Sequence, residues 1–318
     1  MGVRGIPRVG IGLAAVVLLG ATVTGCGGGD EHSGHEMTVV PVAAPAVLQG
    51  FSHPESVLVA GDAWFVSNVG PVQDATAKDG DGFLSRLDQT GTLTELKAIP
   101  RSGDAPLNAP KGMAYTGNKI FVADIDRVVG YDANTLGQVF EAKLEGDAPA
   151  LLNDIAVLDG KTLLVTDSLR GSVYKLDLES KRFGTVTTAV PGANGVVADQ
   201  TGKTVYVAAL GADFKGGDLF VLDLARIPAQ PKKIGTVHGI LDGLALLPDG
   251  NLAVSDWVSV EPPTAGTITI YRPDGTAAAA VKLPENLIGP ADFTVDGSGR
   301  NLLVPGMADN KLAIVELG

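Results

Sequence analysis

The sequence predicts an all-β protein built as a six-bladed β-propeller, and three observations support this fold class. Glycine is abundant, at 42 of 318 residues, which is typical of short strands joined by tight turns. Six segments repeat one pattern of a polar start, an apolar strand, a turn rich in Gly, Asp or Asn, and a second apolar strand. Patterns typical of amphipathic helices are nearly absent.

The repeats start at equivalent residues that are separated by 41 to 56 positions. We call this set the inner ring, and its members are Glu55, Lys111, Asn153, Asn194, Asp242 and Ala291. A four-stranded propeller blade needs roughly 40 to 50 residues, so six blades fill residues 46–318 as one domain. A β-sandwich has no need for six copies of one motif, and β-helix repeats are much shorter.

Each repeat predicts a pair of strands joined by a hairpin turn that contains glycine. The predicted pairs span residues 53–68, 110–124, 152–167, 193–209, 241–256 and 290–306. Most repeats continue with a third strand, and residues 171–177 and 217–223 alternate as half-buried strands do. The longest interval, between the first two repeats, predicts an insertion around Val72–Asp81, which is a polar loop.

The N-terminus predicts export and lipid anchoring. Arg4 and Arg8 precede an apolar run at residues 9–19, which is too short for a membrane span and typical of a secretory signal. Residues 23–26 resemble a bacterial lipobox that ends in Cys26, the single cysteine. We therefore expect a signal peptide at 1–25 and lipidation of Cys26, which places the protein at the periplasmic or extracellular face of the bacterial cell envelope. The alternative is an incidental thiol.

Residues 26–45 have the composition of a flexible tether between the anchor and the propeller. His32 and His35 in this segment are suitable donors for a transition metal, although the same residues also suit a solvated linker.

Composition also limits the partners. With 24 Lys and Arg against 36 Asp and Glu, the formal charge is −12, which disfavours nucleic acid. A single cysteine excludes an internal disulfide and a cysteine zinc cluster. No complete phosphate-binding loop occurs, so nucleotide binding is not expected. We expect a monomer that binds a small molecule and contacts the membrane only through its anchor.

Equivalent residues of every blade meet near the axis of a propeller, so the inner ring predicts a polar site at one mouth of the channel. Glu55, Asn153, Asn194 and Asp242 supply two carboxylates and two amides, which suit calcium, with zinc or manganese as alternatives. The other interpretation is that Asn-Gly and Asp-Gly steps only make turns. A second ring lies at the ends of the following strands and comprises Asn68, Asp124, Asp167, Ala209, Asp256 and Gly306.

The steps Asn194-Gly195 and Asp242-Gly243, together with Glu55 and Asn153, resemble the metal-ligand pattern of the regucalcin/gluconolactonase-like (SGL) propellers. This resemblance implies a divalent cation on the channel axis, with Asp242 as the base that opens sugar lactones. The stretches 78–83, 107–113, 122–126, 152–155 and 254–257 resemble an exported lipoprotein branch of this superfamily.

Lys111 is the second catalytic candidate, because its ammonium group at the same mouth would stabilise an oxyanion or hold an anionic substrate. The alternative for Lys111 is a salt bridge to Asp124 or Asp126. Asp124, Asp167, Asp256 and Trp257 are candidates for contact with the substrate. Two functions therefore follow: a metal-dependent hydrolase of a small lactone or ester, or a non-catalytic propeller lipoprotein that binds a ligand or a protein.

Overall fold

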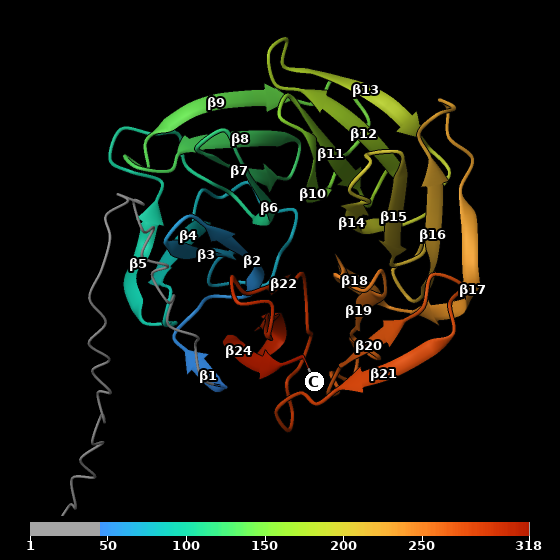
Figure 1. Cartoon of the computed structure of the whole chain (residues 1–318). Helices are drawn as coiled ribbons and strands as arrows, with labels where there is room; N and C mark the ends of the chain where they lie inside the picture. The colour runs from blue at the N-terminus through green and yellow to red at the C-terminus, as the bar shows by residue number, and fades with distance from the viewer. Residues whose placement is uncertain (1–44, 318) are drawn as a thin grey trace, which may run out of the picture. The chain divides into compact units, whose positions relative to one another are not determined.

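The six-bladed β-propeller is confirmed by the computed structural model, which describes residues 45–317 (Figure 1). Six antiparallel sheets of four strands each surround a central axis. The predicted signal peptide, Cys26 and the tether with His32 and His35 lie outside the described residues, apart from the last residue of the tether. Within residues 45–317, no helix has the length and hydropathy of a membrane-spanning segment.

The first five blades each use four consecutive strands, which run from the inner strand at the axis to the outer strand at the periphery (Figure 1). Blade one comprises β2 (Pro54–Ala60), β3 (Ala63–Asn68), β4 (Phe83–Asp88) and β5 (Leu93–Ile99). Blade two comprises β6 (Pro110–Thr116), β7 (Lys119–Asp124), β8 (Arg127–Asp132) and β9 (Gln138–Lys143). Blade three comprises β10 (Leu152–Asp159), β11 (Thr162–Asp167), β12 (Ser172–Asp177) and β13 (Arg182–Thr187).

Blades four and five follow the same order. Blade four comprises β14 (Ala193–Ala198), β15 (Thr204–Ala209), β16 (Gly217–Asp223) and β17 (Lys232–Gly239). Blade five comprises β18 (Leu241–Leu246), β19 (Leu252–Asp256), β20 (Thr267–Tyr271) and β21 (Ala277–Val281).

Blade six joins the two ends of the propeller. It comprises β22 (Thr294–Val295), β23 (Asn301–Gly306), β24 (Lys311–Glu316) and, as its outer strand, β1 (Ala46–Gln49). A short 3₁₀ helix, η1 (Met307–Asp309), lies between β23 and β24. The β1 strand pairs antiparallel with β24, from Ala46 opposite Ile314 to Gln49 opposite Lys311. The ring of blades is therefore closed by backbone hydrogen bonds between the first and last strands of the domain.

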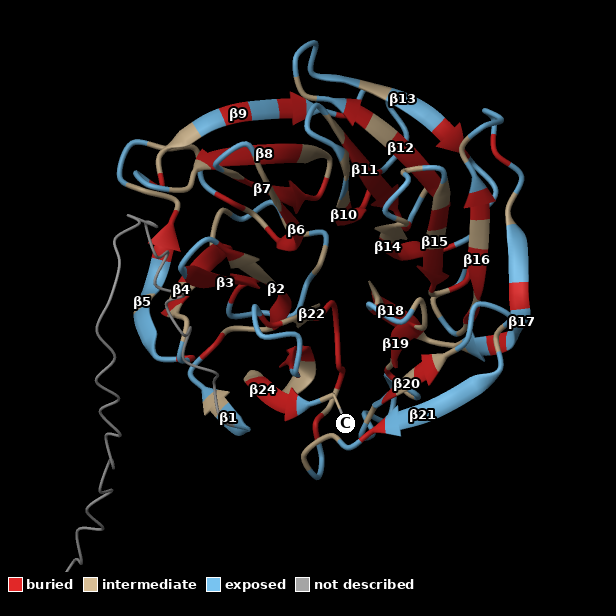
Figure 2. Cartoon of the chain, viewed as in Figure 1, coloured by how far each residue is buried: buried red, intermediate tan, exposed pale blue. Residues whose placement is uncertain are grey.

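Burial follows the position of each strand in its blade (Figure 2). Inner and second strands are mostly buried, as in β3, where all six residues are buried. Outer strands face solvent, as in β21, where four of five residues are exposed. Apolar side chains from neighbouring blades pack together, so that Phe121 of β7 and Leu163 of β11 share one cluster. The blades therefore stabilise each other through their faces, because no four-stranded sheet alone buries both of its faces.

We expect the closure by β1 to contribute measurably to stability. A chain that begins at Gly50 lacks the four-residue ladder between β1 and β24 and exposes the edge of β24. Relative to a chain that begins at residue 45, its melting temperature should fall by roughly 5–10 °C, as measured by circular dichroism. Equal melting temperatures would show that the closure contributes nothing.

Candidate functional site

A β-bulge on the inner strand presents each polar inner-ring residue to the axis. The strand register shifts between Leu152 and Ile155 in β10, between Ala193 and Val196 in β14, and between Leu241 and Leu244 in β18. Corresponding shifts occur in β2, between Pro54 and Ser56, and in β6, between Pro110 and Met113. Because a bulge re-aims side chains and interrupts pairing, the inner ring lies where the sheet regularity is broken.

Hydroxyl groups on the second strand accept hydrogen bonds from backbone amides that the bulges leave without a partner strand. The Ser56 amide donates to Ser67 Oγ (2.9 Å), and the Asp154 amide donates to Thr166 Oγ1 (2.9 Å). In blade five the Gly243 amide donates to Ser255 Oγ (2.7 Å). These bonds satisfy amides that would otherwise be buried without partners, so they fix the bulge conformation.

The carboxylates of the second ring hold the loops that lead into the inner strands. Asp124 Oδ1 accepts the amides of Asn108 (3.0 Å) and Ala109 (2.9 Å). Asp167 Oδ1 accepts the Leu151 amide (3.0 Å), and Asp256 Oδ1 accepts the Ile240 amide (3.0 Å). Each bond fixes the backbone two or three residues before an inner-ring residue.

These bonds place Asp124, Asp167 and Asp256 against the loops, and their contact with the substrate stays a prediction. Of the residues described, those that line the axial cavity include none of the three. Asp124 and Asp167 are fully buried, and Arg127 Nη2 lies 2.7 Å from Asp124 Oδ2. Backbone amides occupy one oxygen of each carboxylate, and an arginine lies near the second oxygen of Asp124 and of Asp167, so these residues hold the loops that position the inner ring.

The inner ring opens into a cavity of about 900 Å³. Five of the six predicted inner-ring residues line it, namely Glu55, Lys111, Asn153, Asn194 and Asp242. All five are buried, with between 2% and 6% of their surface exposed. The volume lies in the range of sites that enclose small molecules.

The cavity contains four buried oxygen atoms without a hydrogen-bond partner. They are Glu55 Oε2, Asn153 Oδ1, Asn194 Oδ1 and Asp242 Oδ1. Only seven buried side-chain oxygens in residues 45–317 lack a partner, and these four come from four different blades. Buried polar atoms are rarely left unsatisfied, so this cluster marks a place where a ligand or cation completes the coordination.

Lys111 lies in the same cavity but forms neither of the salt bridges considered from the sequence. Its Nζ donates hydrogen bonds to the backbone oxygens of Ala109 (2.8 Å) and Ala75 (3.0 Å). Burial lowers the pKa of Lys111 to about 8, although the charge of Glu55 opposes this effect. Two of the three N–H donors of the ammonium group are thus used in hydrogen bonds. The bond to Ala75 also fixes the insertion of blade one against the site.

Trp257 is buried, with 8% of its surface exposed, and its indole Nε1 donates a hydrogen bond to Asp242 Oδ2 (2.7 Å). This bond fixes one oxygen of the carboxylate and leaves Oδ1 as the unpartnered atom. Trp257 also lines the cavity. The ring therefore orients Asp242.

Burial raises the pKa values of four carboxyl groups around the axis. The pKa of Asp242 rises to about 7 and that of Asp154 to about 6, chiefly because burial disfavours the charged form. For the same reason the pKa values of Glu55 and Asp292 lie well above their usual range. Repulsion among these acids raises the pKa values of Glu55, Asp242 and Asp292 further. Without a cation, it is therefore unfavourable for several of these groups to be ionised at once.

Three loops supply much of the cavity wall, and the sequence reasoning identified only part of them. Gln73 and Ala75 belong to the insertion 69–82, whose presence the repeat spacing predicts but whose position does not follow from spacing. The loops 210–216 and 257–266 add further lining residues. In each case the loop joins the second and third strands of a blade.

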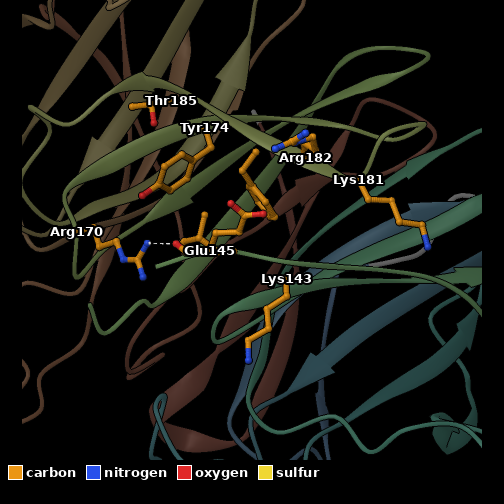
Figure 3. A pocket seen from close by; sticks show the side chains of 9 residues that line it. Lys143, Glu145, Arg170, Tyr174, Lys181, Arg182 and Thr185 are labelled. Atoms are coloured by element: carbon orange, nitrogen blue, oxygen red, sulfur yellow. Dashed lines mark hydrogen bonds between the residues drawn. The ribbon is translucent and has the colours of Figure 1, made fainter. Parts of the chain in front are cut away.

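A second pocket, near Arg170 on blade three, provides a contrast (Figure 3). Lys143, Lys181 and Arg182 also line it. Arg170 is committed to the protein itself: its guanidinium donates to the backbone oxygens of Glu145 (3.1 Å), Pro149 (3.2 Å) and Ala148. Arg170 therefore holds the loop 145–149 in place. None of the described residues that line this pocket has a buried side-chain oxygen or nitrogen without a hydrogen-bond partner, unlike those of the axial cavity.

Comparisons with known proteins support the fold. No family model matches the chain, and no curated protein matches it either. A 6-phosphogluconolactonase-like protein of Bacteroides fragilis has a TM-score of 0.52 and 19% identity, and the match covers 82% of each chain. An inactive variant of virginiamycin B lyase from Staphylococcus aureus, with quinupristin, has a TM-score of 0.54 and 14% identity, covering 86% of this chain and 99% of that one. Hydrazine synthase of Kuenenia stuttgartiensis has a TM-score of 0.54 and 19% identity, covering 87% and 77%. At such identities the likeness shows a shared propeller fold.

We expect the stability of the metal-free protein to fall as the pH rises towards 7. The folded protein holds a proton on Asp242 up to a pKa of about 7, whereas an unfolded aspartate releases it near pH 4. The stabilising contribution is therefore complete below about pH 4 and is lost as the pH rises through 7.

The measurement is the melting temperature between acidic and neutral pH in the presence of a chelator. Asp242→Asn should reduce the fall in melting temperature between acidic and neutral pH. The control Asp218→Asn should not, because Lys233 and His238 outweigh partial burial and lower the pKa of Asp218, which lies outside the cavity. Equal slopes for Asp242→Asn and the unaltered protein would contradict the assignment.

Proposed function

We propose that the protein is a calcium-dependent hydrolase of a small lactone or ester, related to the SGL superfamily and anchored in the cell envelope through Cys26. The observation that carries this proposal is the group of four unpartnered buried oxygens in one cavity. The anchor and location rest on the N-terminal sequence pattern alone. The propeller neighbours, which include a lactonase-like protein and a lyase, are compatible with catalysis at this mouth.

The chemistry of the donors fits calcium better than zinc. Within residues 45–317, no three His, Cys, Asp or Glu side chains gather as a metal site. The candidate ligands are instead two carboxylates, Glu55 and Asp242, and two amides, Asn153 and Asn194. Calcium accepts such mixed oxygen sets, whereas zinc prefers nitrogen and sulfur. A bound cation would also offset the repulsion between buried acids, and it would polarise the carbonyl of a substrate.

Asp242 is the proposed general base. Trp257 holds Oδ2 in place, so Oδ1 would use one lone pair for the cation and the other to take a proton from the water that attacks the carbonyl carbon. The carbon–oxygen bond of the lactone or ester then breaks, and the proton passes from Asp242 to the alkoxide that leaves. The products are a carboxylic acid and a hydroxyl group, and Asp242 returns to its starting state.

Lys111 is the proposed oxyanion stabiliser. Its Nζ has two donors engaged by backbone oxygens, which leaves a third for the negative charge that develops on the carbonyl oxygen. Burial of the lysine strengthens this interaction, because the surrounding dielectric is low.

Calorimetric titration with calcium tests the ligand set. Asn153→Ala and Asn194→Ala should each weaken binding by at least about tenfold, since each removes an oxygen ligand. Asn134→Ala is the matched control, because Asn134 is exposed and lies outside the cavity. A folded protein that binds no calcium would overturn the metal-dependent mechanism and favour a non-catalytic binding propeller.

Lys111→Met separates the two effects of the ammonium group. Removal of a positive charge beside the site should strengthen calcium binding by about tenfold. Hydrolysis of a lactone should nevertheless slow by roughly 100-fold in kcat, because the oxyanion loses a donor. The readouts are calorimetry and a pH-indicator assay of ring opening. If kcat is unchanged, Lys111 has no role in the reaction.

A further inference from the structure

The axial cavity is lined by a group of large apolar side chains in addition to its polar inner ring. Blades one and two contribute Glu55, Gln73 and Lys111. The loops of blades four and five contribute large apolar side chains, namely Leu210, Phe214, Trp257, Val258 and Val260. These two blades are neighbours, since their inner strands β14 and β18 are in contact. The apolar residues therefore come from loops of adjacent blades, and we call this set the apolar wall.

The apolar wall is accessible to solvent. Val258 is 52% exposed and Val260 is 48% exposed, whereas Phe214 and Leu210 are half-buried. Deeper in the cavity Trp257 and Met307 belong to one apolar cluster, with Ile240 packed against it. An apolar surface that runs from solvent to a buried polar site is typical of a pocket that encloses an apolar group.

The backbone of the wall supports a role for Val258 in binding. Val258 has a φ of +63°, in the left-handed region that β-branched residues rarely adopt. Its amide donates to Asp256 Oδ1 (2.8 Å), the same carboxylate that holds Ile240. The loop thus holds an unfavourable residue in an exposed apolar position, which a polar residue would occupy with less strain.

The two loops also carry charged side chains. Asp213, Lys215 and Glu261 also line the cavity, but all three are exposed. The unpartnered oxygens of Glu55 and Asp242, by contrast, are fully buried at the inner ring. The cavity therefore has a buried polar end at the inner ring and a solvent-exposed rim where apolar residues lie among charged ones.

We propose that the substrate is amphiphilic: a lactone or ester that carries an alkyl or aromatic substituent, which lies against the apolar wall. The carbonyl end would reach Lys111 and the four inner-ring oxygens, and the apolar substituent would contact Phe214, Val258 and Val260. A polyhydroxylated sugar lactone would instead leave its hydroxyl groups against apolar side chains without partners. This inference rests on the proposed function for the identity of the polar end only.

Binding of non-hydrolysable lactams tests the apolar wall independently of catalysis. Calorimetry on the purified protein with calcium would use a series of γ-lactams with alkyl substituents of increasing length. We expect affinity to rise by roughly two- to fourfold for each added methylene, as for transfer of alkyl groups from water to an apolar surface. A flat series would overturn the inference.

A matched pair of variants locates the effect. Val258→Asn should reduce the gain per methylene while raising the melting temperature or leaving it unchanged, because asparagine tolerates a positive φ. Val139→Asn is the control, since Val139 is also 52% exposed but lies on the outer strand β9. An unchanged gain in Val258→Asn would show that the substituent lies elsewhere and would overturn the assignment.

Hydrolysis distinguishes failure of this inference from failure of the proposed function. The matching lactones should show kcat/KM values that rise with chain length and exceed that of gluconolactone. Faster hydrolysis of gluconolactone would refute the amphiphilic substrate and keep the hydrolase. Tight binding of long-chain lactams without hydrolysis of any lactone would refute the hydrolase and keep the apolar wall as a binding surface.

Discussion

The structure depends on hydrogen bonds that hold the backbone next to the inner strands of four blades. A carboxylate or amide at the end of the second strand accepts amides from the loop that precedes the inner strand, as Asp124, Asp167 and Asp256 do. Hydroxyls such as Thr166 Oγ1 then satisfy the amides freed by the bulges. Because every amide near the axis is buried, these acceptors are needed for the fold itself. They also fix the direction of the inner-ring side chains.

The glycines that follow the inner-ring residues have a steric cause. A Cβ at Gly195 would lie 2.3 Å from the backbone oxygen of Asp242, and one at Gly243 would lie 2.6 Å from that of Ala291. Neighbouring inner strands therefore approach too closely for any side chain at these positions. The Asn-Gly and Asp-Gly steps are not ordinary turns, as one interpretation of the sequence had it, since both lie within strands β14 and β18. The same close approach brings oxygens from separate blades into one cavity.

Electrostatics at the axis and the asymmetry of the cavity suggest how the site works. Buried acids raise each other's pKa, and the ammonium of Lys111 supplies a positive charge in the same cavity. A propeller would place equivalent residues symmetrically, but loops of unequal length break that symmetry. The insertion 69–82 contributes Gln73 and Ala75, and the loops 210–216 and 257–266 contribute all the large apolar side chains of the apolar wall together with charged ones. The inner strands of the blades therefore supply the polar residues of the site, and the loops between strands determine which ligand can reach them.

The sequence alone determined the number of blades, the inner ring and the presence of an insertion, because repeated strands and their turns are local patterns with a fixed period. It could not determine that β1 closes blade six, since that pairing joins residues more than 260 positions apart. It assigned Asp242 and Asp256 to different rings but could not show that Asp242 lines the cavity whereas Asp256 holds a loop, because these roles depend on contacts made only in the folded chain. The tertiary structure decided their roles through the partners that each carboxylate meets. The apolar wall likewise exists only once the loops of two adjacent blades lie side by side.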